Sequence, residues 1–349
     1  MAKKAKKEKA TVSGSDAAQA AIKKKFGEGI IVSGQSIVEA PKMLIPFSPA
    51  HDLMLGGGIP EGTWTIVTGP PKVGKTTSAL DFAGTCQRPE YDSPDSGPRK
   101  VFFFNVEGRL KDRDLRGIKH LILSDDRFEV VKSKKGKILD AADYLEIAET
   151  YINEVPGCVI VFDSFSQLCS KERKEAEVGE RFRDDVPLML SSFCKRMCNV
   201  LPVNDCIFLG ITHLIANQAP GAKKQTMEAG GRKIQYNSDI KMVATHRTFE
   251  PKEGVAKGQI IHWKCEWAAS GAPGGKCDSF LRYDHGIDKQ WEVIDMGVDL
   301  GVIEKSGGWY LLPGEDKKIN GKDKVSDYLR ENPLLFDAVY AQCREMLGL

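Results

Sequence analysis

The chain has 349 residues, enough to bury a large core and to form more than one domain. Its 41% hydrophobic and 28% charged residues are ordinary for a globular protein, and a net charge of +2 excludes any general attraction to nucleic acid. No apolar run is long enough to span a membrane, and the basic N-terminus lacks the apolar segment of a secretory signal.

The N-terminal region predicts a tail, a helix and a short strand. Residues 1–14 are rich in lysine and then in serine and glycine, which is typical of a disordered basic tail. A helix is expected to begin near Ser15 or Asp16 and to end at Gly27. The apolar stretch "GIIVSG", residues 29–34, then predicts a short strand.

From residue 63 onward, apolar strands alternate with helices. This alternation predicts an α/β fold, in which a mostly parallel, twisted sheet is covered by helices on both faces. The expected strands are 63–69, 100–107, 157–164 and 206–213, and the expected helices run from the residue 74 region to Gln87, over 139–154 and over 186–200. Nine cysteines are scattered singly, which indicates reduced thiols that pack as small apolar groups.

Beyond residue 238 the pattern changes. Residues 239–247, 258–267 and 277–286 predict consecutive strands joined by polar or glycine-rich turns. The remainder of the chain predicts a small, mostly helical module with a hairpin-like piece at "GGWYLLPG", residues 307–314. No internal repeat is present.

A phosphate-binding loop is predicted between the first strong strand and its helix. The stretch "GPPKVGKT" fits the pattern G-x-x-x-x-G-K-[ST] with Gly69, Gly74, Lys75 and Thr76. Its glycines let backbone N–H groups turn toward a phosphate, Lys75 adds a positive charge, and the Thr76 hydroxyl can bind Mg²⁺. The alternative is a solvated glycine-rich turn. The residues expected to bind nucleotide here are Gly69, Pro70, Lys72, Val73, Gly74, Lys75, Thr76 and Thr77.

Three polar residues end the neighbouring strands. Asp163 ends an apolar strand and is expected to bind Mg²⁺ with Thr76, although a helix N-cap is an alternative. Glu107 ends another strand and is expected to orient a water molecule for hydrolysis, although a solvated surface acid is an alternative. His213 stands where a sensor of the γ-phosphate would lie, or it is a strand-end histidine with a backbone partner.

These pieces, in this order, resemble the RecA family of recombinases over nearly the whole chain. "GGGIPEGTWTIVTGPPKVGKTT", "FFFNVEGRL" and "VIVFDSFSQL" are similar to the family's phosphate loop, catalytic-glutamate strand and Walker B strand. The family's N-terminal helix-strand junction resembles "KKFGEGIIVSG". Its C-terminal domain resembles "GGWYLLPGE" followed by "VSDYLRENP". The resemblance implies a DNA-dependent ATPase that forms helical filaments on single-stranded DNA and catalyses homologous pairing and strand exchange.

The resemblance also implies two loops that hold DNA. By position, the first lies at Lys171–Asp185 and the second at Leu214–Lys233. Independently of the family, the second segment has suitable chemistry, because its glycines allow close approach to phosphate and its cations attract it. An ordinary surface loop is the alternative. The expected DNA-binding residues are Arg181, Arg183, Lys223, Lys224, Gly230, Gly231, Arg232 and Lys233.

The chain departs from the family's pattern at three places. Bacterial members carry glutamine where His213 stands, and they carry two lysines that reach a neighbouring subunit's γ-phosphate. Lys264 matches the first lysine, but Glu266 stands in place of the second. An acid facing a triphosphate is unfavourable unless a cation intervenes, so we expect Glu266 to hold a cation such as K⁺. Asp114 occupies the region of the adenine-stacking tyrosine.

We therefore expect ATP and Mg²⁺ as cofactors, with K⁺ as a further candidate, and single-stranded and duplex DNA as partners of a homo-oligomeric filament in a bacterial or host cytosol. The expected domains are a tail over 1–14, an N-terminal oligomerisation segment over 15–38, an ATPase core over 39–286 and a C-terminal domain over 287–349. A hexameric helicase-like motor of the same fold, or a non-catalytic paralogue that binds partners, remains the alternative.

Overall fold

The computed structural model describes residues 14–177, 185–216, 226–228, 234, 237–250, 257–268 and 273–349. The chain divides into two compact units, Met1–Lys42 and Met43–Leu349. The first unit holds helix α1 (Gly14–Phe26) and helix α2 (Gly34–Glu39). Helix α1 matches the first predicted helix, and it ends before Gly27 as expected.

The strand predicted over residues 29–34 is wrong. Residues 28–31 form turns and bends, and the Ser33 Oγ accepts a hydrogen bond from the Ser36 backbone N–H at 3.0 Å, which caps α2. A strand needs a partner for its backbone N–H and C=O groups. Within the described part of the chain no strand pairs with this segment, so its apolar side chains, such as Ile30 and Val32, are exposed.

The second unit is built on one large sheet. Its ten strands among the described residues are β3 (Trp64–Gly69), β4 (Val101–Asn105), β5 (Phe128–Val131), β6 (Val159–Asp163), β7 (Ile207–Ala216), β8 (Thr226–Glu228), β9 (Ile240–Glu250), β10 (Gly258–Trp267), β11 (Lys276–Arg282) and β12 (Gly286–Ile287). The order is β12-β11-β10-β9-β3-β7-β6-β4-β5, with β8 paired to β7. Pairing is parallel from β9 through β3 to β5 and antiparallel from β9 to β12, so the mostly parallel sheet is confirmed.

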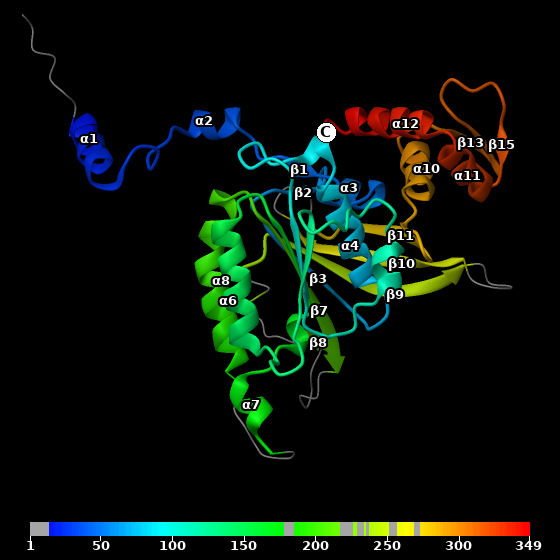
Figure 1. The fold of residues 1–349 in the computed structure, drawn as a ribbon. Helices are drawn as coiled ribbons and strands as arrows, with labels where there is room; N and C mark the ends of the chain where they lie inside the picture. The colour runs from blue at the N-terminus through cyan, green and yellow to red at the C-terminus, as the bar shows by residue number, and fades with distance from the viewer. Residues whose placement is uncertain are drawn as a thin grey trace, which may run out of the picture. The chain divides into compact units, whose positions relative to one another are not determined.

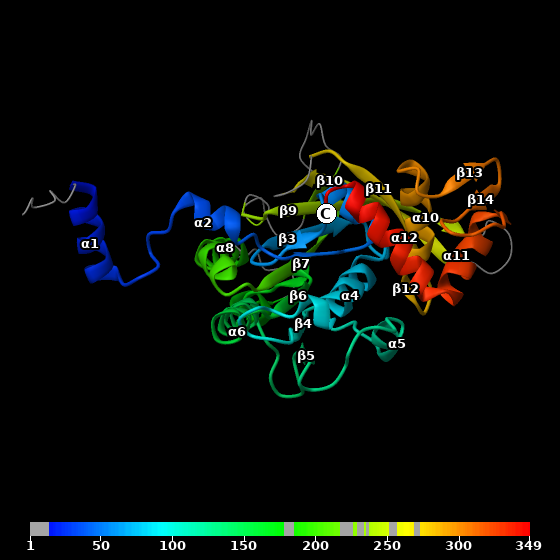
Figure 2. The same cartoon turned by 90° about the horizontal axis from the view of Figure 1, so that it is seen from above.

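Helices cover both faces of this sheet (Figures 1 and 2). One face packs against α6 (Ala141–Glu154) and α8 (Val186–Val203), and the other packs against α3 (Pro49–Leu55) and α4 (Lys75–Cys86). Because successive side chains of a strand point to opposite faces, β4 sends Phe102 and Phe104 into the first core and Val101 and Phe103 into the second. This two-sided burial explains why the parallel strands read as continuous apolar runs.

Short elements complete the second unit. They are β1 (Leu44–Ile45), β2 (Ile59–Pro60), α5 (Asp112–Arg116), α7 (Lys171–Glu175) and two 3-10 turns over Pro89–Tyr91 and Phe165–Gln167. All nine cysteines are free thiols, and several of them, including Cys86 and Cys194, pack inside the two cores. Among the described residues, no helix is both long enough and apolar enough to cross a lipid bilayer.

The end of the chain forms a smaller layer with its own core. It contains α10 (Lys289–Asp299), β13 (Glu304–Ser306), β14 (Trp309–Leu311), β15 (Ile319–Asn320), α11 (Lys322–Glu331) and α12 (Pro333–Met346). The hairpin-like piece predicted at 307–314 lies in the three-stranded sheet β13-β14-β15. Val293, Tyr310, Val325 and Val339 belong to the core that joins these elements.

Buried carboxylates attach this layer to the rest of the second unit. Glu292 of α10 is 2% exposed, and its Oε2 accepts the Ala50 backbone N–H of α3 at 3.1 Å. Asp52 of α3 is fully buried and accepts hydrogen bonds from the Tyr340 hydroxyl and, at 3.3 Å, from Arg344 of α12. Since buried charges are costly unless they are hydrogen-bonded, these contacts fix the position of α10 and α12 on α3.

Candidate nucleotide-binding site

The predicted phosphate loop connects β3 to α4. Gly69 is the last residue of β3 and Gly74 caps the first turn of α4, which begins at Lys75. Both glycines are needed for close approach: a Cβ atom at Gly69 would lie 2.6 Å from the Ala244 carbonyl oxygen, and one at Gly74 would lie 2.7 Å from Ile261. Gly74 also has a φ of +108°, a conformation that disfavours other residues.

Lys75 and Thr76 make contacts that a phosphate and a metal could replace. The Lys75 Nζ donates to the carbonyl oxygens of Gly69 at 2.9 Å and Pro70 at 2.7 Å, and its side chain is only 4% exposed. Burial lowers the pKa of Lys75 to about 8, although Asp163 and Glu107 act in the opposite direction. A buried ammonium group at the start of a helix is well placed to bind an anion.

Asp163 and Thr76 form an oxygen-only donor set. The Thr76 hydroxyl donates to the Asp163 Oδ2 at 2.7 Å, and Asp163 is 8% exposed. Burial raises the pKa of Asp163 to about 6, and the Thr76 hydrogen bond partly offsets this effect. Hydroxyl and carboxylate oxygens are the ligands that Mg²⁺ prefers, so the two side chains fit the predicted metal.

Glu107 and His213 are in contact. The His213 Nε2 is hydrogen-bonded to the Glu107 Oε1, and the Ser164 hydroxyl donates to the same oxygen at 3.1 Å. These contacts, with the His213 hydrogen bond first, lower the pKa of Glu107. The His213 backbone N–H donates to the Ser166 hydroxyl at 2.8 Å, which holds the end of β7 against the segment after β6.

Strand register explains why these residues meet. Gly69 of β3 is paired with His213 of β7, and Asn105 of β4 is paired with Asp163 of β6. All four residues therefore lie at the carboxyl edge of the parallel strands, where ligands bind in α/β sheets.

A pocket of about 750 Å³ lies at this edge. The predicted residues that line it are Lys72, Val73, Gly74, Lys75, Thr76, Thr77, Glu107, Asp163 and His213. Asp114, noted above as a departure from the family's pattern, lines it too. Gly69 and Pro70 are not among the lining residues, and their backbone carbonyl oxygens accept hydrogen bonds from the Lys75 Nζ.

The pocket is also lined by residues that the sequence analysis did not single out, among them Arg247, Gln259 and Tyr283. They come from β9, from β10 and from the turn after β11, far along the chain from the phosphate loop. No local motif marks Arg247 or Gln259. The one signal in the sequence is an aromatic residue near the end of a predicted strand; in the structure Tyr283 is exposed just after β11.

The expected DNA-binding side chains lie outside the described residues. This applies to Arg181, Arg183, Lys223, Lys224, Gly230, Gly231, Arg232 and Lys233. The described parts of the two segments differ from simple loops: the first begins with α7, and the second begins with the end of β7 and contains β8. Leu214–Ala216 and Thr226–Glu228 pair as antiparallel strands, because backbone groups of adjacent extended segments satisfy one another.

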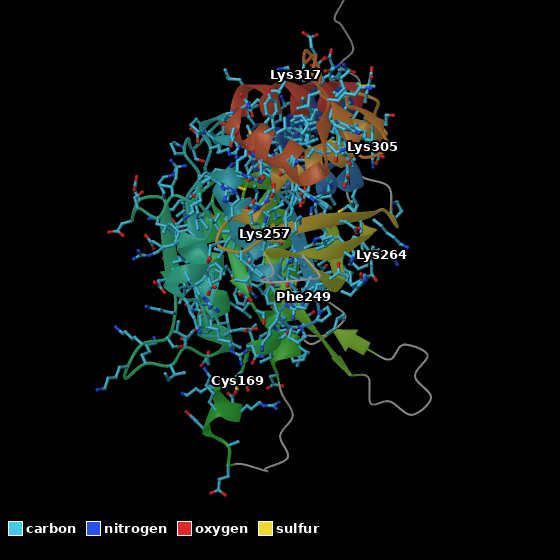
Figure 3. The ribbon with its side chains drawn as sticks, turned by 90° about the vertical axis from the view of Figure 1, so that its right-hand side faces the viewer. Cys169, Phe249, Lys257, Lys264, Lys305 and Lys317 are labelled. Carbon is cyan, nitrogen blue, oxygen red and sulfur yellow. The ribbon has the colours of Figure 1, made fainter. Side chains whose placement is uncertain are left out.

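Lys264, labelled in Figure 3, lies on β10. It is not among the residues that line the pocket. Glu266, two residues further, pairs with Lys241 of β9, whose Nζ lies 2.8 Å from the Glu266 Oε2. The Lys241 side chain is buried and its Nζ lies 4.9 Å from the centre of the Trp267 ring. A lysine of this chain therefore supplies a positive charge next to Glu266.

Comparisons with known proteins match both parts of the second unit. The family model described as AAA domain matches residues 42–197, and the model described as RecA C-terminal domain matches residues 291–348. Protein RecA of Aquifex aeolicus is 28% identical over 331 residues, which cover 94% of this chain and 91% of the relative. Protein RecA of Acidothermus cellulolyticus is 28% identical over 333 residues, covering 95% and 91%. Protein RecA of Aquifex pyrophilus is 27% identical over 337 residues, covering 96% and 92%.

The fold and the site together define a P-loop nucleotide-binding protein with a RecA-like α/β core and a smaller C-terminal layer. The matches confirm the resemblance to the RecA family over nearly the whole chain. At the level of the family, they support a role in DNA recombination and repair that involves ATP and DNA binding.

Proposed function

We propose that this protein is an ATP-dependent DNA recombinase that forms helical filaments on single-stranded DNA and catalyses homologous pairing and strand exchange. The observation that supports it most is the meeting of Lys75, Thr76, Asp163 and Glu107 at one sheet edge, in a chain similar to Protein RecA along 94% of its length. A P-loop alone would be compatible with many nucleotide-driven proteins.

The reaction proposed is transfer of the γ-phosphoryl group of ATP to water. Lys75 gives up its two carbonyl contacts and pairs with the phosphates, while Glu107 orients the attacking water. Mg²⁺ held by Thr76 and Asp163 would neutralise charge on the phosphate oxygens. His213, already bonded to Glu107, would respond to the γ-phosphate, and Lys264 would reach the phosphates of a neighbouring subunit.

ATP would act mainly as a ligand that stabilises the filament, and its hydrolysis would permit release. The proposed partners are single-stranded and duplex DNA and further copies of this chain, in the cytosol of a bacterium or of an infected host. Residues 15–38 would dock on a neighbouring copy, 39–286 would form the ATPase core, and 287–349 would form the C-terminal domain.

A K⁺ ion at Glu266 is a finer proposal. Because Lys241 already neutralises Glu266 within this chain, K⁺ would bind only where a neighbouring triphosphate draws the carboxylate away. This proposal would be rejected if the rate of ATP hydrolysis were the same in K⁺ and in Na⁺ and if Glu266→Lys left that rate unchanged.

The test is ATP hydrolysis measured with and without single-stranded DNA, followed by a strand-exchange assay between a circular single strand and a homologous linear duplex. The proposal expects DNA-stimulated hydrolysis and joint molecules. Duplex unwinding by closed hexamers would support the helicase-like alternative. Absence of turnover despite partner binding would support the non-catalytic one.

A further inference from the structure

The phosphate loop is held from outside by two side chains of the antiparallel strands. The Arg247 Nη1 of β9 donates to the Lys72 carbonyl oxygen, and the Gln259 Nε2 of β10 donates to the Val73 carbonyl oxygen at 3.0 Å. The Arg247 Nη1 also donates to the Gln259 Oε1 at 2.9 Å. We call these three hydrogen bonds the Arg247–Gln259 relay. The bond from Arg247 occupies the Gln259 Oε1, so the Nε2 end of the Gln259 amide is the end that faces Val73.

The surroundings keep this relay in place. Gln259 is 3% exposed, and its Nε2 lies 3.3 Å from the position that a Cβ at Gly74 would take. Arg247 packs its guanidinium 4.8 Å from the ring centre of Phe249, which Figure 3 labels on β9. The loop thus contacts β9 and β10 closely enough for their side chains to control its backbone.

Control of these two carbonyl groups determines the direction of two amides. In a trans peptide the C=O group and the following N–H group point in opposite directions. Because the carbonyl oxygens of Lys72 and Val73 point toward Arg247 and Gln259, the N–H groups of Val73 and Gly74 point away from these side chains. Backbone N–H groups of such loops are the donors that hold a phosphate.

We infer that Arg247 and Gln259 are positioning residues, which preset the Val73 and Gly74 amides for the β-phosphate of a bound nucleotide. This inference rests on the proposed function only in requiring that the loop binds nucleotide. Lys72 has a φ of +59°, an uncommon conformation for a residue with a side chain, so the loop needs such external support.

The test compares nucleotide binding by the full chain and by Gln259→Met, measured by calorimetry with ATP, ADP and AMP in the presence of Mg²⁺. Methionine matches glutamine in size and carries no charge, so the change removes hydrogen bonds without altering the electrostatics. We expect ADP and ATP to bind about tenfold more weakly, since one buried hydrogen bond is lost and one amide is freed to turn. AMP, which lacks the β-phosphate, is expected to bind within about twofold of its original affinity.

A second variant keeps the test valid if Gln259→Met folds poorly. Arg247→Ala alters a half-buried side chain and removes the same hydrogen bonds from the other side, so by itself it should weaken ADP and ATP binding and leave AMP binding within about twofold. Where both variants fold, a double-mutant cycle should be strongly non-additive, because the two side chains are hydrogen-bonded to each other. Thr248→Ala is the matched control. It lies next to Arg247, its side chain is exposed on the opposite face of β9, and it should leave all three affinities unchanged.

Three results would overturn the inference: unchanged affinities, equal weakening for AMP and ADP, or weakening for ATP with ADP unaffected. The last result would mean that the relay acts at the γ-phosphate instead. Failure of the unaltered protein to bind ADP would be a different outcome, because it would refute the proposed nucleotide site itself.

Discussion

Replacing Glu292 by glutamine should change how the stability of this protein depends on pH. Glu292 lies on α10 with its Oε2 bonded to the Ala50 backbone N–H, and a glutamine carbonyl oxygen can accept the same bond. Burial raises the pKa of Glu292 to about 7 from an ordinary value of 4.5. Between these two values the folded chain holds a proton that the unfolded chain has released.

The sign and size follow from this difference. Because the folded state binds more protons in this window, the free energy of unfolding falls as pH rises from about 4.5 to about 7. The interval between pH 5.5 and the pKa of folded Glu292 is about 1.5 pH units. At about 1.4 kcal/mol per unit, the unaltered protein loses about 2 kcal/mol of its free energy of unfolding over this interval. Glutamine does not titrate, so the variant escapes this loss of stability. The free energy of unfolding of Glu292→Gln, relative to that of the unaltered protein, should therefore rise by about 2 kcal/mol between pH 5.5 and pH 8.

Urea unfolding at pH 5.5 and pH 8 measures this difference for the second unit. Asp299→Asn, at the exposed end of the same helix, is the control, because solvent surrounds that side chain in the folded and in the unfolded chain. A stability difference between Glu292→Gln and the unaltered protein that is the same at both pH values would refute the reasoning.

Four further predictions concern the site and the core. Lys75→Ala should lower kcat/KM for ATP at least about 100-fold, because the charge nearest the phosphates is lost, and retained activity in a phosphate-release assay would refute the site. Glu107→Gln should abolish hydrolysis while calorimetry still detects ATP binding, and equal loss of both would contradict its role. Affinity for single-stranded oligonucleotides should fall with salt, with a logarithmic slope of about −0.7 per phosphate contacted, whereas a flat response would exclude phosphate contacts by the two loops. Gly210→Ala should destabilise the chain by about 1–3 kcal/mol, because the new Cβ would lie 2.3 Å from the Phe165 ring, and an unchanged melting temperature would contradict this.

The central fold could be predicted because its signals are local. Each buried parallel strand is a continuous apolar run, and the phosphate loop is a compact motif with strict spacing. Asp163, Glu107 and His213 could be placed near this loop because parallel strands end at the same edge of a sheet. Asp163 is the last residue of β6, Glu107 lies two residues after β4, and His213 lies where the parallel pairing of β7 with β3 ends.

Other features depend on contacts between distant parts of the chain. Arg247 and Gln259 reach the phosphate loop from positions 175 and 186 residues further along, where no motif marks them. Lys241 meets Glu266 through the pairing of β9 with β10, so only the register of that pair shows how the acid is neutralised.

The apolar stretch at residues 29–34 shows the opposite error. Its composition favours a strand, but a strand also requires a neighbour, which the sequence pattern alone does not provide. Within the described residues the Ser33 cap and α2 form instead, and Ile30, Val32, Ile37 and Val38 remain exposed.

Electron microscopy of the purified protein with single-stranded DNA, Mg²⁺ and a non-hydrolysable ATP analogue tests the central claim most directly. If the proposal is right, open helical filaments form only when nucleotide and DNA are both present. The Lys75→Ala variant should form no filaments under the same conditions. Closed rings, or particles of the unaltered protein that stay monomeric under these conditions, would contradict the proposal.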